Sequence, residues 1–169
     1  MANMSQPSNP TMPHPPTVPD GRAASRDAAF TRTHNRELLR VRAHWLVDLF
    51  PDELVIQEKM ICVIRNEFLV SYTETIPVKD IGRVVYINTL LFGGLRIIGK
   101  NTQHELHIKG LGKKAAIEAK DIIEGLLLED SGVIDVPHWV ETDKRRDILA
   151  SAGSDPELED ELDERAHEY

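Results

Sequence analysis

A helical spacing of apolar residues runs from about residue 112 to residue 128. Ala115, Ala119, Ile122 and Leu126 recur there every three or four positions, and charged residues stand between them. This pattern predicts an amphipathic helix with one apolar face. Because most of the sixty residues before it are typical of short strands, we expect this helix to cover a sheet.

The pattern between residues 53 and 109 is that of short strands. Residues 68 to 73 alternate with a period of two, which places Phe68, Val70 and Tyr72 on one side and predicts a half-buried antiparallel strand. Six or seven strands are expected in all, and short apolar runs place the others near residues 53–57, 60–65, 84–89, 95–99 and 105–109.

A second helical spacing lies within residues 31–50, where Leu38, Val41, Trp45 and Leu49 recur every three or four positions. This spacing predicts a helix that ends at a proline. The basic residues lie mainly off its apolar stripe: Arg36, Arg40, Arg42 and His44. Such a helix either docks on the sheet with its arginines in solvent, or lies on an anionic membrane surface.

Composition divides the rest of the chain. Residues 1–30 are rich in proline and poor in apolar side chains, which predicts a disordered tail. Residues 51–128 form the predicted domain. Residues 129–153 predict an extended tether and a short helix that begins near Thr142. Residues 154–169 are dominated by acids and predict a disordered acidic tail.

The loop from Leu90 to Gly94 combines three large apolar residues with two glycines. The glycines can supply the backbone conformations that a hairpin requires. Two interpretations remain open from the sequence. Either Leu90 and Leu91 end a strand and Phe92 folds onto the core, or the loop is an apolar wedge for a lipid or a protein partner.

Lys113 and Lys114 stand in the first turn of the predicted covering helix. Cations oppose the helix dipole there, at a cost of a few tenths of a kcal/mol. Again two interpretations remain open. The two lysines are either exposed to solvent or in contact with an anionic surface.

The formal net charge of −8 is spread unevenly. Residues 1–46 carry six arginines and three acids, whereas residues 129–169 carry fourteen acids and four bases. A chain that is acidic overall lacks the clustered cations that phosphate contacts need, so we expect no nucleic-acid partner. No apolar run approaches the roughly 20 residues of a membrane-spanning helix, and we expect a cytoplasmic protein.

Candidate chemistry is sparse. The single cysteine, Cys62, lies in an apolar run, where it is expected to pack rather than react. The seven histidines are dispersed, so no metal site is predicted, and no glycine-rich phosphate loop has the required spacing. We therefore expect no cofactor and no enzymatic activity.

One part of the chain resembles the bacterial pleckstrin-homology-like (PH-like) family, over about residues 51 to 128. The resemblance rests on the order of the predicted elements and on two motifs, Tyr72-Thr73-Glu74-Thr75-Ile76-Pro77-Val78-Lys79-Asp80-Ile81 followed by Val84-Val85, and Phe92-Gly93-Gly94-Leu95-Arg96-Ile97. It implies an α+β fold, an antiparallel barrel or sandwich closed by one C-terminal helix and here preceded by the amphipathic helix. It also implies a binding or scaffolding role, often near membranes.

We therefore expect a non-catalytic adaptor that binds a protein partner through a sheet edge or through the loop at Leu90, Leu91 and Phe92. The alternative is peripheral attachment to anionic lipid through the basic helix. The residues expected to serve that attachment are Arg36, Arg40, Trp45, Lys113 and Lys114. The sequence does not indicate an oligomeric state.

Overall fold

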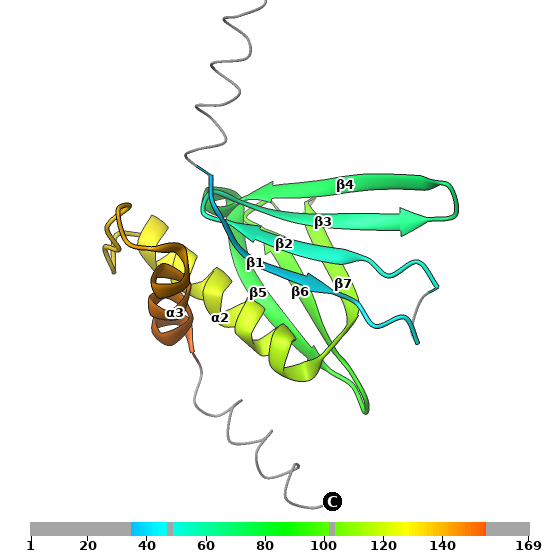
Figure 1. Cartoon of the computed structure of the whole chain (residues 1–169). Coiled ribbons are helices and arrows are strands. Elements are labelled where there is room, and N and C mark those ends of the chain that lie inside the picture. The colour runs from blue at the N-terminus through cyan, green and yellow to red at the C-terminus, as the bar shows by residue number, and fades with distance from the viewer. Residues whose placement is uncertain (1–34, 47–48, 102–103, 155–169) are drawn as a thin grey trace, which may run out of the picture.

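The structure is a computed structural model that describes residues 35–46, 49–101 and 104–154. The predicted tail at residues 1–30 and the acidic residues 155–169 lie outside this range. The described chain is α+β (Figure 1). Its elements are β1 (Glu37–Arg42), β2 (Glu53–Gln57), β3 (Met60–Glu67), β4 (Val70–Pro77), the 3-10 turn η1 (Val78–Asp80), β5 (Ile81–Asn88), β6 (Gly93–Gly99), β7 (Glu105–Leu111), α2 (Lys113–Asp130) and α3 (Thr142–Gly153).

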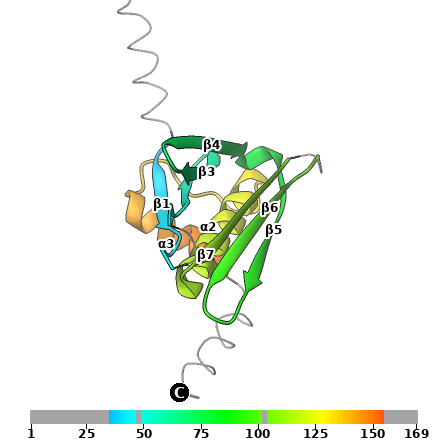
Figure 2. The same cartoon turned by 90° about the vertical axis from the view of Figure 1, so that its right-hand side faces the viewer.

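The strands form two antiparallel sheets, in the orders β1-β2-β3-β4 and β5-β6-β7. Strands of the two sheets run in clearly different directions, and α2 packs on β5, β6 and η1 (Figure 2). The predicted α+β class with about seven short strands and a following helix is confirmed. The sheets do not close into a barrel, so that part of the expectation is wrong.

One apolar core joins both sheets and α2. It follows the two periodicities of the sequence, because alternate strand residues and every third or fourth helix residue point inward. Leu38 of β1 and Leu149 of α3 belong to the same core, so both elements pack on the predicted domain. Its fully buried members include Leu54, Ile56, Ile61, Val63, Leu95, Ile97, Ala119, Ile122 and Ile123.

The prediction of a helix within residues 31–50 is wrong for the residues of that stretch that the structure describes. Residues Glu37–Arg42 form strand β1, in which Leu39 and Val41 pack against the core while Arg40 and Arg42 are exposed. The stretch satisfies both a helical and an alternating pattern. The edge of β2 decides between them, because pairing with it satisfies one side of the β1 backbone and buries the apolar side chains of β1.

The strand predicted through residues 68–73 is interrupted. Phe68 and Leu69 form the turn of the β3–β4 hairpin, and Leu69 has a positive φ of 66°. The hairpin extends beyond the three-stranded sheet (Figure 1). For this reason Val70 and Tyr72 alternate as predicted but remain exposed.

Both predicted helices after residue 112 are confirmed, as α2 and α3. They cross closely at two glycines. A Cβ atom on Gly125 would lie 2.1 Å from the Leu149 carbonyl oxygen, and one on Gly153 would lie 2.1 Å from the Asp121 carbonyl oxygen. Glycine is therefore required at both positions for α3 to reach α2.

Candidate binding surface

Two loops present large apolar side chains to solvent at the same end of the molecule. We define the loop surface as Trp45 and Leu46 in the β1–β2 loop together with Leu90 and Leu91 in the β5–β6 loop. Their exposed fractions run from 65% to 87%. Exposed apolar residues are ordinary when they are scattered, but a group of large ones marks an interaction site.

The β5–β6 loop is closed by the side chain of Thr89. Its hydroxyl donates to the carbonyl oxygen of Phe92 at 2.6 Å, and the Phe92 N–H donates back to the hydroxyl oxygen at 3.2 Å. The Thr89 N–H also donates to the Phe92 carbonyl, at 3.0 Å. These bonds leave Leu90 and Leu91 at the exposed tip of a closed turn.

Contacts of His44 and Phe92 join the two loops. The ring centroids of His44 and Phe92 lie 5.3 Å apart, and the His44 ring also stacks beside Trp45 at 6.2 Å. The His44 N–H donates to the Gly110 carbonyl oxygen at 2.7 Å, which ties the β1–β2 loop to the end of β7. Phe92 is thereby half-buried against the exposed His44 and lies outside the core cluster.

Because β5 ends at Asn88, Leu90 and Leu91 lie in the loop and do not end the strand. The interpretation that these leucines end a strand and Phe92 folds onto the core is therefore wrong.

Three lysines flank the loop surface. Lys113 and Lys114 begin α2, and the first residue of β6 abuts that helix, since a Cβ atom on Gly93 would lie 2.8 Å from Ala116 Cβ and 3.4 Å from Lys113 Cα. Lys109 lies near the end of β7 and is exposed. Within the described chain none of these lysines forms an ion pair, so their charges face solvent beside the apolar loops.

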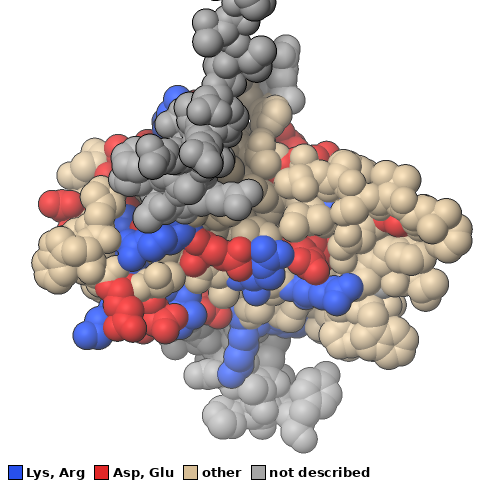
Figure 3. Space-filling model, turned by 45° about the horizontal axis from the view of Figure 1, so that its top comes forward, with Lys and Arg blue, Asp and Glu red and all other residues tan. Residues whose placement is uncertain are grey.

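The end of the molecule that carries the β1–β2 loop shows few charged residues on one face (Figure 3). Figure 3 shows few Lys, Arg, Asp or Glu residues on the right-hand side, where the β1–β2 loop and the β3–β4 hairpin lie, while both signs of charge mix over the middle of this face. Phe50 and Phe68 meet there edge to face, with ring centroids 5.9 Å apart. The apolar character of this end therefore extends to the hairpin.

Arg36 and Arg40 lie away from the loop surface. Arg36 forms an ion pair with Glu58 at 2.7 Å and also donates to the carbonyl oxygens of His138 and Val140. Arg40 lies on the exposed side of β1 and pairs with Glu37 and Glu53, and hydrogen bonds to these carboxylates raise its pKa. Of the residues expected to bind a partner or lipid, the structure brings together Leu90, Leu91, Phe92, Trp45, Lys113 and Lys114.

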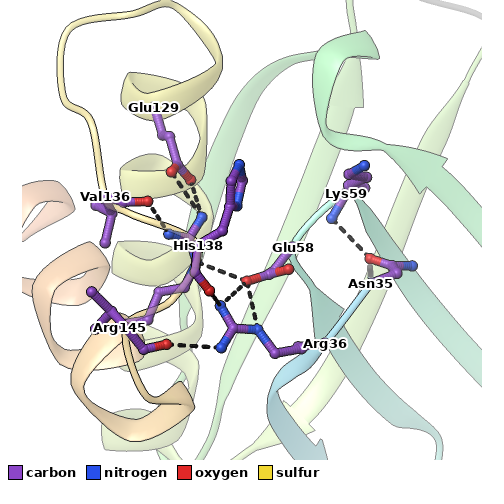
Figure 4. A network of polar contacts seen from close by, with 9 residues as sticks. Asn35, Arg36, Glu58, Lys59, Glu129, Val136, His138 and Arg145 are labelled. Carbon is purple, nitrogen blue, oxygen red and sulfur yellow. Dashed lines mark hydrogen bonds and ion pairs between the residues drawn. The ribbon is translucent and has the colours of Figure 1, made fainter. Parts of the chain in front are cut away.

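Sequence reasoning missed a buried polar network between the residues just before β1, the β2–β3 turn, α2 and α3 (Figure 4). Arg145 is only 1% exposed and pairs with Glu58 at 2.9 Å and with Glu129 at 2.6 Å. Glu58 lies between Arg145 and Arg36. No local pattern could have revealed these pairs, because their members are far apart in the chain.

A hollow of about 630 Å³ opens beside this network, and Lys79, Asp130 and His138 line its other side. The guanidinium of Arg145 and the carboxylates of Glu58 and Glu129 already bind each other. The charged groups of the network are therefore paired with one another, and the network stabilises the packing of α3.

Arg65 forms a second junction, between the sheets. Its guanidinium pairs with Asp52 at 2.6 Å and with Glu74 at 3.2 Å, and it donates to the carbonyl oxygen of His107. Asp52 lies at the end of the β1–β2 loop, where its carbonyl also accepts the Ala43 N–H. Arg65 therefore helps to hold that loop in place.

Other candidate chemistry is limited. Cys62 is buried, and this burial raises the pKa of its thiol. Within the described residues no group of three or more His, Cys, Asp or Glu side chains is placed to hold a metal ion. None of the described helices combines the length and apolar character needed to cross a membrane.

The chain was compared with protein-family models and with curated proteins. No family model matches the chain, and no curated protein matches it.

Proposed function

We propose that this chain is a non-catalytic PH-like binding module that holds a protein partner on the loop surface. The observation that carries the proposal is the junction of the two loops at His44 and Phe92, which presents Trp45, Leu90 and Leu91 together on a braced support. A preformed apolar surface loses little conformational entropy on binding. The order of a four-stranded sheet, a three-stranded sheet and a following helix supports the PH-like assignment.

The charges beside the loops indicate the chemistry of the partner. Lys109, Lys113 and Lys114 supply positive charge at the rim, and rim charges steer a partner of opposite sign. We therefore expect the partner to present apolar side chains bordered by acidic ones. Raised salt should slow association and leave the apolar contacts in place.

The membrane alternative takes a different form from the one expected. In the described residues, strand β1 stands where the basic helix was predicted. The side chains of Arg36 and Arg40 are paired with carboxylates and are not free to bind lipid phosphates. The three rim lysines and the exposed leucines are what remains for lipid. At about 1 kcal/mol for each cation, such binding would be weak and would vanish at high salt.

The test is affinity capture by the wild-type chain, by the double variant Leu90→Ser with Leu91→Ser, and by Val133→Ser as the matched control. Val133 is also largely exposed but lies after α2, outside the loop surface. A specific protein retained by the wild type and the control, lost with the double variant, and bound again by both purified components would support the proposal.

Flotation with neutral and anionic vesicles distinguishes a protein partner from a lipid surface. Salt-sensitive flotation that depends on Leu90 and Leu91, without capture of any protein, would replace the protein partner by a lipid surface. Capture that the double variant leaves unchanged would remove the loop surface from the function.

A further inference from the structure

The two sheets have four edge strands, β1, β4, β5 and β7. An edge strand carries backbone N–H and C=O groups that another strand can pair with. Proteins that stay monomeric protect such edges with charges, irregular pairing or covering groups. The four edges of this fold differ in that protection.

Three of the edges are protected. β1 has a register shift near its start and carries the charged side chains of Arg40 and Arg42. β5 also has a register shift near its start, next to Arg83. The edge of β7 is covered by Arg65, whose guanidinium donates to the backbone carbonyl of His107.

Over most of its length, β4 has neither irregular pairing with its neighbour nor a side chain that covers its open backbone. Its register with β3 is continuous from Val70 to Pro77. The ring nitrogen Nε2 of His104 lies 3.1 Å from the Thr75 carbonyl oxygen, so this carbonyl points away from β3. The two-residue period of a strand then places the backbone N–H and C=O groups of Ser71 and Thr73 on the same open edge. Neither backbone bonds to another segment of the described chain.

The same hairpin exposes apolar side chains along this edge. Phe68, Leu69, Val70 and Tyr72 have exposed fractions from 45% to 88%. A hairpin whose side chains remain in solvent would gain from a further strand beside it, because the strand would cover these side chains and bond the open backbone.

We propose that two copies of this chain pair antiparallel along β4, about a two-fold axis that passes between their Tyr72 residues. The two four-stranded sheets then become one continuous sheet. In this register Ser71 exchanges backbone hydrogen bonds with Thr73 of the second copy. The Thr75 carbonyl stays outside the pairing, where it keeps its contact with His104.

The β4 strand is complementary to itself in this register. Tyr72 faces Tyr72 of the second copy at a position without backbone hydrogen bonds, where side chains come closest and aromatic pairs are favourable. Glu74 faces Val70, so no like charges stand opposite each other. A closed two-fold arrangement also uses up both open edges, which prevents growth into a fibre.

The hairpin tip reaches a hollow of about 430 Å³ on the other copy. This hollow lies beyond Thr75 and is lined in part by Ile76, Lys100 and His104. In the proposed register the turn at Phe68 and Leu69 stands opposite Ile76 and Thr75 of the other copy, so the turn lies beside this hollow. The interaction is separate from the loop surface, since Trp45, Leu90 and Leu91 take no part in it.

The test is the mass of the full chain in solution, measured by sedimentation equilibrium over a range of concentrations, for the wild type and for Thr73→Pro. Proline removes the N–H that Thr73 directs outward and leaves the bonds to β3 intact. Because the two-fold axis doubles the loss, the dimer should weaken by a factor of roughly 10 or more. A wild type that is monomeric at every concentration, or a dimer that Thr73→Pro leaves unchanged, overturns the proposal.

Oxidative cross-linking tests the register and does not depend on the folding of the proline variant. Tyr72→Cys should form a covalent dimer, because cross-strand neighbours at this position lie within disulfide reach. Glu37→Cys on the exposed side of β1 is the matched control and should stay monomeric. Equal cross-linking of both variants, or none at Tyr72→Cys, overturns the pairing about Tyr72.

Discussion

Arg145 Nε lies 2.9 Å from Glu58 Oε1, and this buried ion pair joins α3 to the turn between β2 and β3. The guanidinium also reaches Glu129 on α2, so one side chain connects three elements. Burial of a charge is costly unless its partners are present. The pair therefore makes the position of α3 depend on the turn of the four-stranded sheet.

Arg145→Met is expected to lower the free energy of unfolding by about 3 kcal/mol, because it leaves Glu58 and Glu129 partly buried without this cation. The midpoint of urea denaturation measures the loss. Arg146→Met is the control, since Arg146 is more exposed and its carboxylate contacts are 3.3 to 3.8 Å long. It should cost less than about 1 kcal/mol. Equal losses would contradict the structural role of Arg145.

Gly125→Ala is expected to separate α3 from α2, because the added Cβ atom meets the backbone of α3 at Leu149. Overpacking of this kind costs about 2 kcal/mol or more. Gly112→Ala provides the comparison, since a Cβ atom there has no neighbour within 4 Å. Thermal unfolding of both variants tests the difference, and a tolerated Gly125→Ala would show that α3 can shift at little cost.

His107 should make the fold less stable at mildly acidic pH. Burial is the largest cause that lowers its pKa from the ordinary value of 6.5, with smaller contributions from Lys109 and Arg65. The unfolded chain therefore binds a proton at a higher pH than the folded chain does. The contribution to stability is complete above about pH 6.5 and is lost as the pH falls toward the lowered pKa.

The difference between the wild type and His107→Gln isolates this effect from the titration of carboxylates. The melting temperature should decrease between roughly pH 7.5 and pH 5.5, and this decrease should be larger for the wild type than for the variant. Parallel decreases in the two proteins would assign the pH dependence to other groups.

Leu90→Ser with Leu91→Ser should change the free energy of unfolding by no more than about 0.5 kcal/mol, because both side chains are largely exposed. Phe92→Ser should cost about 1 to 2 kcal/mol, since it removes a half-buried ring that contacts His44. Denaturation curves of the two variants check the expected order. The reverse order would place the leucines in the core and Phe92 in solvent.

Leu69→Gly should stabilise the monomeric fold by up to about 1 kcal/mol. Leu69 has a left-handed backbone conformation that a side chain disfavours and glycine adopts freely. Phe68→Gly is the comparison, because the neighbouring turn residue has no such backbone strain. Urea denaturation at a concentration where the chain is monomeric measures both, and a less stable Leu69→Gly would mean that its side chain makes a contact the turn needs.

The apolar periodicity of the sequence was sufficient to locate α2 and most of the strands, and the capping residue near Thr142 located α3. These features depend on the spacing of neighbouring residues, which is a local property. The same reasoning failed within residues 31–50, where Leu38 and Val41 fit a helix while Leu39 and Val41 fit a strand. Only pairing with β2, which is the next strand along the chain and lies outside the ambiguous stretch, resolves that ambiguity.

The candidate site shows the same division. The sequence identified Leu90, Leu91 and Phe92 as unusual because three large apolar residues stand in a predicted turn, whereas it named Trp45 only as part of a helix that the structure does not contain. It could not show that His44 joins the two loops, nor that Arg36 is paired with Glu58. Such contacts join residues far apart in the chain.

Outside residues 31–50, local pattern thus determined which segments become helices and strands, because side-chain periodicity and backbone preference act over a few residues. Tertiary packing decided which apolar residues stay exposed, which charges are paired and which sheet edge stays open. The ion pair of Arg145 with Glu58 and the open edge at Thr73 both arise only when distant segments meet. Their energies depend on burial and on the presence or absence of a neighbour, which spacing along the chain does not encode.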